Sequence, residues 1–426
     1  MPNKLQEGIY LNGVERPYNR TKKSSYRNKT FAILFLRTKK TSRSAEVKQA
    51  INELWKKYEL LKKGRIYDNG EKYSVPSGNL TVLIGYGPKI FQLFGTVKRI
   101  PRDFEGKQFL PAIGSRPILN GSGIRYSTER HDNFGLHEHL VIQLISDSQL
   151  PSYRAIVETW KEVHKERNVL SLTSFYTGFQ RDDRRSWLGF HDEVSNLKDE
   201  DERRRAITID RNNNNLLPRD FWTQGGTYLA FMRIAIDLLT WEKIGRRKQE
   251  LVVGRNKHTG SFLTGVDKKG RPIYKRIPRT LRDPFMSKEL QNHPDYFRIN
   301  SYSSKYSGID IESSTTILNQ SHIGRSRHID EIDSKYPSSR RIFRQGFEFV
   351  ESARDGVLTA GLNFVSFQND PGRLFFILSD TNWMGKANFG GSPQDVQLNN
   401  LLSVMTTGIF FIPPNERPFP GACIFN

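Results

Sequence analysis

Short apolar runs alternate with segments that carry apolar residues on one helical face in the first half of the chain. In order, they predict a strand, a helix, two strands, a helix and a strand at residues 30–36, 45–63, 80–87, 137–146, 152–167 and 169–178. The second helix is expected to place Ile156, Val157, Trp160 and Val163 on its apolar side. This order of elements is typical of a ferredoxin-like unit.

The same order restarts after a polar break. Residues 197–220 contain a mixed charge run and four consecutive asparagines at 212–215, and only residues 206–209 there have the composition of a strand. Strands or helices are then predicted at 226–236, from 238, at 361–368, at 374–378 and at 408–414. We therefore predict an α+β fold of two ferredoxin-like units, with an N-terminal domain at 1–196, a linker at 197–220 and a C-terminal domain at 221–426.

One connection in the second half is unusually long. Residues 255–320 are polar and punctuated by proline and glycine. Loops of such length are usually functional or cover a site.

Length and composition narrow the class of protein. The 426 residues suffice for two domains, and no apolar run reaches the roughly 18 residues of a membrane span. Residues 1–6 resemble neither a signal peptide nor a twin-arginine signal, which predicts a soluble, cytoplasmic protein. The single cysteine, Cys423, excludes intrachain disulfides and thiolate clusters that bind zinc or iron–sulfur. A metal would therefore need His or carboxylate ligands, or would arrive inside a cofactor.

The chain is strongly basic, with 66 Lys and Arg against 45 Asp and Glu and a net charge of +21. Such a charge fits nucleic acid, an anionic membrane surface or an anionic substrate. The basic residues are scattered, however, and none of their clusters reaches the five or six like charges of a binding tail. We interpret them as a solvated basic surface. Nucleic acid is disfavoured, and polyanion binding is a remote alternative.

Three polar residues are candidates for chemistry: Asp192, His322 and Arg344. Taken alone, Asp192 fits a turn or a helix cap, and a single histidine is more often a hydrogen-bonded structural residue. Arg344 follows Ile342 and Phe343 and could simply extend to the surface.

Their sequence contexts, taken together, resemble the dye-decolourising (DyP-type) haem peroxidases. Gly189-Phe190-His191-Asp192, followed by Asn196, resembles the Gly-Phe-x-Asp-Gly motif of that family, and Ser321-His322-Ile323 resembles its Ala-His-Ile/Val segment. Further similar segments lie at 225–229, 233–234, 239–242, 249–250, 254–260, 341–346, 361–370 and 411–414, with weaker ones at 81–87 and 110–112. The order and spacing of these segments make the resemblance specific.

The resemblance implies a fold of the dimeric α+β barrel type whose C-terminal unit binds haem b. His322 would bind the iron, and the cofactor-binding residues would be His322, Arg325, Gly189, Phe190 and Phe367. Hydrogen peroxide and a dye-like or phenolic organic substrate would be the reactants, and homo-oligomers are left open.

The same resemblance implies catalytic roles for two residues. Asp192 would move a proton between the two oxygens of the peroxide. Arg344 would supply positive charge where negative charge develops, and would lower the pKa of Asp192.

Some positions depart from the family pattern. Glu193 stands where the motif has glycine, which costs about 1–2 kcal/mol if φ is positive there, and its carboxylate would oppose ionisation of Asp192. Arg325 would take the place of an Arg that is common one position earlier, and Arg340 or Arg341 could replace Arg344. These departures leave open a haem-binding or haem- and iron-handling protein of the same fold, with weak or altered peroxidase activity.

Overall fold

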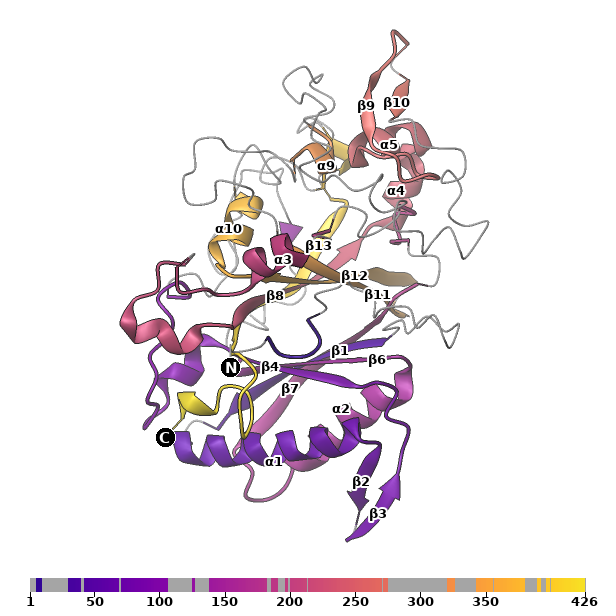
Figure 1. Ribbon diagram of the computed structural model, residues 1–426. Helices are drawn as coiled ribbons and strands as arrows, with labels where there is room; N and C mark the ends of the chain where they lie inside the picture. Colours follow the sequence, from indigo (N-terminus) through magenta and orange to yellow (C-terminus); the bar gives the residue numbers. More distant parts are fainter. Residues whose placement is uncertain are drawn as a thin grey trace, which may run out of the picture.

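The strands of the first half form one antiparallel sheet in the computed structural model (Figure 1). They are β1 (Thr30–Thr38), β4 (Thr81–Tyr86), β6 (Leu140–Ser146) and β7 (Leu170–Phe179). Their spatial order, β4-β6-β1-β7, places the first and third of the four side by side in the middle. This is the arrangement of a ferredoxin-like unit, as predicted.

The second half repeats this order. Its strands are β8 (Thr227–Ile236), β11 (Phe343–Arg354), β12 (Val357–Gln368) and β13 (Leu402–Ile412), arranged as β11-β12-β8-β13. Again the first and third strands are central, so the duplication predicted from the element order is confirmed. The apolar pattern did not predict β11, because polar residues such as Arg344 and Gln345 interrupt it.

The two half-sheets meet edge to edge and close a barrel. At one seam, Glu348 of β11 pairs with Phe179 of β7, and at the other, Phe411 of β13 pairs with Tyr86 of β4. Each seam has one such pair between its described strands, so side chains inside the barrel provide most of the contact between the halves. Phe31 and Phe347 illustrate this contact, since their fully buried rings stack 4.4 Å apart. The predicted barrel type is thereby confirmed.

Helices cover the outer face of each half-sheet (Figure 1). On the N-terminal half these are α1 (Ser44–Lys62) and α2 (Gln149–Val163), joined by a hydrogen bond of 2.6 Å between the Tyr58 and Thr159 hydroxyl groups. On the C-terminal half they are α4 (Leu238–Ile244), α5 (Arg246–Val253), α9 (His322–Arg325) and α10 (Gly372–Ser379). Helix α3 (Glu200–Ile207) contacts β11 and β12 and directs its last two residues into the barrel.

Short elements complete the described chain. They are β2 (Arg65–Asp68), β3 (Glu71–Ser74), β5 (Arg125–Tyr126), β9 (Leu263–Val266), β10 (Pro272–Tyr274), and 3-10 turns at Pro88–Gln92, Pro218–Thr223, Val396–Leu398 and Ala422–Ile424. The structure describes residues 5–9, 30–39, 42–68, 70–105, 125–126, 138–181, 185–190, 196–197, 200–212, 214–269, 271–274, 320–325, 342–354, 356–379, 389–391, 396–398 and 400–425. Within these ranges no helix is long and apolar enough to cross a bilayer.

Two local expectations are wrong. Ala206 and Ile207 end helix α3 instead of forming a strand, and both are buried inside the barrel with Leu197. In α2, Ile156 and Val163 are buried as expected, but Val157 and Trp160 are exposed. The buried face of α2 is set by α1 and the sheet together, which hydrophobic spacing alone does not show. The domain boundaries at 196 and 220 remain a prediction.

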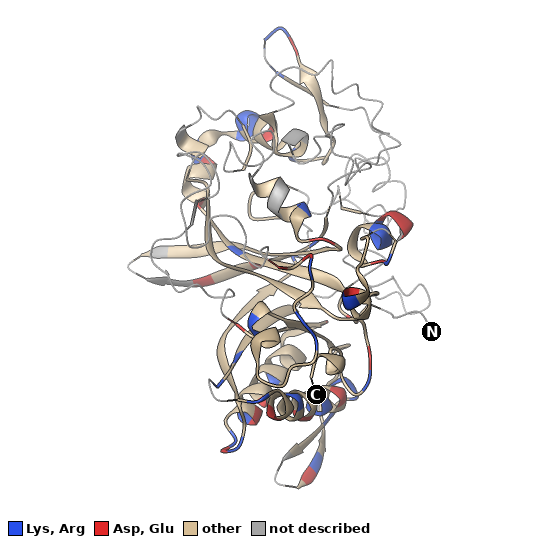
Figure 2. Ribbon diagram, turned by 90° about the vertical axis from the view of Figure 1, so that its left-hand side faces the viewer, with Lys and Arg blue, Asp and Glu red and all other residues tan. Residues whose placement is uncertain are grey.

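Charged residues lie mostly on the outer helices and the loops, whereas the barrel strands are largely uncharged (Figure 2).

The apolar contact inside the barrel, which holds the halves together, can be tested by mutation. Replacing Phe347 by alanine should lower the free energy of unfolding by about 3–5 kcal/mol, because it removes the ring that stacks on Phe31. Urea unfolding would measure this. Val350→Ala is the matched control, since Val350 lies on the same strand but is 46% exposed, and it should change stability by no more than about 0.5 kcal/mol. Equal effects of the two substitutions would contradict this account of the barrel.

Candidate functional site

His322 begins α9 on the outer side of the C-terminal half, and its ring is held in one orientation. Its Nδ1 lies 2.9 Å from the carbonyl oxygen of Phe389, and the two rings stack 4.4 Å apart. A carbonyl oxygen only accepts, so Nδ1 carries the hydrogen and Nε2 presents its lone pair. No hydrogen-bond partner of Nε2 is found among the described residues. An imidazole in this tautomer is able to bind a metal through Nε2.

The surroundings of His322 keep it neutral. Burial lowers its pKa to about 4, and the Phe389 carbonyl opposes this shift while the charges of Arg344 and Arg255 add to it. The electrostatic effect of Arg344 on the imidazole shows that the structure brings these two predicted residues into one region. Arg344 itself is half-buried.

Two glycines allow the backbone to approach α9 closely. A Cβ on Gly390 would lie 2.5 Å from the Val252 carbonyl oxygen and 2.7 Å from the backbone nitrogen of His322. A Cβ on Gly254, the left-handed residue that ends α5, would lie 2.6 Å from Oγ of Ser321. The histidine is therefore positioned from two sides by backbone that only glycine permits.

The predicted distal segment turns at Gly189, which has φ of +83°. Its amide nitrogen donates to the Ser186 carbonyl at 2.8 Å, and the Arg185 guanidinium donates to the carbonyl oxygens of Gly189 and Lys257. A side chain on Gly189 would overlap that of Lys257. Arg185 thus joins the turn to the loop that follows α5.

Trp241 of α4 lies between the distal segment and the histidine. Its ring is buried and contacts Phe190 and Phe389, each at 6.3 Å between centroids, and its Nε1 donates to the Leu188 carbonyl at 2.9 Å. A continuous row of rings therefore runs from Phe190 through Trp241 and Phe389 to His322.

Lys257 completes this framework. Its ammonium donates to Oε1 of Gln249 at 2.7 Å and lies 5.8 Å from the centre of the Phe190 ring, and burial is the main cause that lowers its pKa. Its backbone nitrogen donates to Glu250 at 2.9 Å. The segments at 239–242, 249–250 and 254–260, which carried part of the resemblance, thus converge around the candidate site.

Arg344 is held by Asn196. The Asn196 amide donates to the Arg344 carbonyl at 2.6 Å and accepts from the Arg344 backbone nitrogen at 3.1 Å. The end of the predicted distal segment is therefore fixed beside the start of β11.

Phe367 does not share this side of the sheet. It is fully buried inside the barrel with Phe343, its cross-strand neighbour, whereas Arg344 pairs with Ser366 on the opposite face. This position conflicts with the predicted contact between Phe367 and a cofactor. By strand alternation Phe364, next to the outer cluster, faces the same side as Arg344.

Other predicted residues lie outside what is described. These are Asp192, Glu193, Arg340 and Arg341, and for Arg325 the backbone of α9 is described but the side chain is not.

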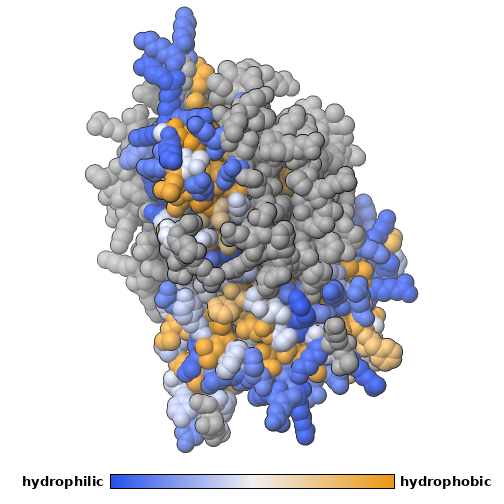
Figure 3. Space-filling view, turned by 180° about the vertical axis from the view of Figure 1, so that it is seen from behind, coloured by the Kyte–Doolittle hydropathy of each residue, from blue (hydrophilic) through white to orange (hydrophobic). Residues whose placement is uncertain are grey.

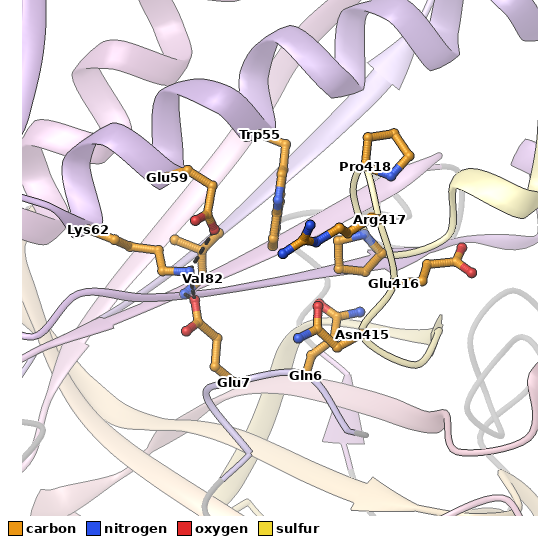
Figure 4. Close-up of a pocket in the computed structure, with 11 residues that line it drawn as sticks. Gln6, Glu7, Trp55, Glu59, Lys62, Val82, Asn415, Glu416, Arg417 and Pro418 are labelled. Atoms are coloured by element: carbon orange, nitrogen blue, oxygen red, sulfur yellow. Dashed lines mark hydrogen bonds and ion pairs between the residues drawn. The ribbon is translucent and has the colours of Figure 1, made fainter. Parts of the chain in front are cut away.

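A cavity of about 470 Å³ lies on the N-terminal half, between α1 and the C-terminal segment (Figure 4). Lys62 binds both Glu7 and Glu59 there, at 2.8 and 2.7 Å, so one cation is shared by two carboxylates. Its lining includes Trp55 and Arg417 but none of the predicted site residues. Elsewhere too, no group of three His, Cys, Asp or Glu side chains within the described ranges could hold a metal ion.

Comparison with known proteins fits the geometry around His322. Residues 183–417, more than half of the chain, match the model of the C-terminal region of DyP-type peroxidases. The chain belongs to the DyP-type peroxidase family. Members of this family are haem-dependent oxidoreductases.

Similar proteins support the same fold. A dye-decolorizing peroxidase of Thermobifida fusca (strain YX) is 26% identical over 155 residues, which are 36% of this chain and 27% of that protein's length. A DyP-type peroxidase of Cellulomonas bogoriensis has a TM-score of 0.61 at 18% identity, covering 100% of this chain and 99% of that one. Ferric DtpA of Streptomyces lividans has a TM-score of 0.62 at 17% identity, covering 99% and 95%.

Sequence reasoning missed Phe389, Gly390 and Arg185. The pair Gly390-Gly391 after an aromatic residue was a usable signal, because adjacent glycines often mark a close backbone approach. No signal in the sequence pointed to Arg185, whose role depends on carbonyl groups from two separate segments.

The close approach at Gly390 gives one test. Gly390→Ala should displace α9 and destabilise the protein by roughly 1–3 kcal/mol, because both overlapping atoms belong to backbone. Thermal unfolding would measure this, with Gly265→Ala as the control, since a Cβ on Gly265 meets nothing within 4 Å. An unchanged Tm for Gly390→Ala would show that α9 has room to move.

The lowered pKa of His322 gives a second test, on the cofactor-free protein. The unfolded histidine titrates near 6.5 and the folded one at about 4, so below pH 6.5 the unfolded state binds more protons and folding loses free energy. Relative to His322→Gln, wild type should lose about 3 kcal/mol of stability between pH 7 and pH 4. Urea unfolding across this range would measure the difference. The exposed His164→Gln should follow the wild-type profile, and parallel profiles for all three proteins would disprove the assignment.

Proposed function

We propose that this protein is a haem-dependent peroxidase that uses hydrogen peroxide to oxidise dye-like or phenolic substrates. One observation carries the proposal: the His322 imidazole is neutral and oriented by the Phe389 carbonyl, and its Nε2 has no hydrogen-bond partner among the described residues. A haem iron needs only this type of protein ligand on one side, since the porphyrin supplies the equatorial nitrogens. The donor set around His322 therefore fits haem b.

The chain would hold the cofactor with residues from several segments. His322 would bind iron through Nε2, and Gly189 and Phe190 would contact the macrocycle from the segment that Arg185 positions. Arg325 is proposed to approach a propionate. Bound haem would supply the iron at which peroxide is reduced.

The Phe389 carbonyl has a specific consequence for His322. A hydrogen bond from Nδ1 raises the basicity of the ligand, and a neutral carbonyl does this less strongly than a carboxylate would. We therefore expect Nε2 of His322 to be a moderately strong electron-pair donor to the iron.

Asp192 and Arg344 are proposed to act on the peroxide. Asp192 would accept the proton of one peroxide oxygen and return it to the other as the bond between them breaks. Its neighbours Phe190 and Asn196 lie at the site, and Asn196 is hydrogen-bonded to the backbone of Arg344. Arg344 would stabilise the negative charge that develops on the leaving oxygen. The adjacent Glu193 would oppose ionisation of Asp192 and so moderate this step.

Reconstitution with haem tests both parts of the proposal. Wild type should bind haem and show a Soret band. His322→Ala should shift the band and weaken binding at least about tenfold, and the control His164→Ala, at an exposed histidine, should not. Asp192→Asn should keep the Soret band but slow the reaction with peroxide about 100- to 10,000-fold in stopped-flow measurements.

The outcomes separate the candidate functions. No Soret band, or one unaffected by His322→Ala, rules out the haem site. Haem binding without any reaction with peroxide would instead favour a haem-binding or haem-handling protein.

A further inference from the structure

The outer face of α2 exposes a stripe of apolar side chains that no described element covers. Leu150, Tyr153, Val157 and Trp160 are 59%, 42%, 43% and 51% exposed. Their spacing of three, four and three residues places them on one side of the helix, along about 15 Å of its length. We call these four residues the α2 stripe.

Two features extend this surface. Phe175 of β7 pairs with Leu34 and so lies on the same helix-covered face of the sheet, where it is 48% exposed. The β2–β3 hairpin projects beside α2 and carries exposed Tyr67 and Tyr73 (Figure 1). The turn that follows the hairpin is tied to the residues before α2, since Asp147 donates its backbone N–H to the Gly78 carbonyl at 2.8 Å.

The charges next to the α2 stripe are arranged asymmetrically. Glu158 and Glu162 have side chains only 6% and 1% exposed, and both turn towards Lys57 of α1, at 3.5 and 3.1 Å. The cations Arg154, Lys161 and Lys165 reach the same carboxylates from the outer side and remain 37%, 40% and 61% exposed. Four cations thus share two carboxylates, so this cluster of six side chains has a net charge of 4 − 2 = +2, with Lys57 on its α1 side and the other three cations on its outer side.

We propose that this face of α2 docks the protein on an anionic lipid bilayer. Aliphatic side chains would enter the headgroup boundary, Trp160 and the tyrosines would lie at the interface they prefer, and the flanking cations would meet lipid phosphates. The overall charge of +21 adds a long-range attraction to such a surface. Figure 3 shows exposed apolar atoms gathered on the N-terminal half, seen from behind, with hydrophilic residues around them.

A second copy of the chain fits this face less well. Two-fold pairing through the α2 stripe would use the same patch twice. It would bring Arg154 and Lys161 of both copies along one seam, where like charges repel. A bilayer with anionic headgroups provides an apolar acyl-chain region for the α2 stripe and negative charge for the flanking cations.

Vesicle sedimentation tests the proposal on the full chain. Wild type should co-sediment with vesicles of phosphatidylcholine and phosphatidylserine, and this binding should fall at high salt and on pure phosphatidylcholine. Val157→Glu should weaken binding about tenfold, because it places a carboxylate in the apolar stripe. Leu358→Glu is the matched control, since it makes the same change in charge at a residue of β12 that is 58% exposed, and it should bind nearly as well as wild type.

Three results would overturn the proposal. Absence of binding to anionic vesicles would do so directly. Equal losses for Val157→Glu and Leu358→Glu would show that net charge alone causes binding. Sedimentation velocity that shows a dimer in wild type and a monomer in Val157→Glu, without vesicle binding, would assign the face to self-association.

Discussion

The fold depends on the burial of two apolar sheet faces against each other. Each ferredoxin-like half has an inner face of aromatic and aliphatic side chains that would be exposed if the half stood alone. Because single pairs join the described strands at the two seams, contacts such as the Phe31–Phe347 stack must hold the halves together. Closing the barrel within one chain buries both inner faces at once. The two outer faces are then covered by helices and loops.

The outer faces of the two half-sheets are covered by different elements, and the candidate site lies on only one of them. On the N-terminal half, α1 and α2 cover the sheet with an ordinary apolar layer. On the C-terminal half, short helices and loops meet over the sheet, where they position His322 and Trp241 on the side that carries Arg344 of β11. Trp241 has a central place here, since it contacts both the segment of Phe190 and the residue whose carbonyl orients His322.

Close backbone approach recurs at this site. Gly254 and Gly390 let α5 and the 389–391 segment touch α9, and Gly189 gives the turn that Arg185 holds. The site is therefore assembled mainly by backbone contacts and hydrogen bonds to carbonyl groups.

The sequence by itself determined the class of fold, because periodicity of apolar residues is a local property. The order of strands and helices in the first half, the duplication and the resemblance around His322 could all be predicted from it. It did not determine β11, whose polar residues are explained by pairing with β12, nor the side of the sheet on which Phe367 lies. The exposure of Val157 and Trp160 depended on where α1 packs against α2. Only the tertiary structure showed that the Phe389 carbonyl orients His322, since a hydrogen bond between residues 67 positions apart leaves no pattern in the chain.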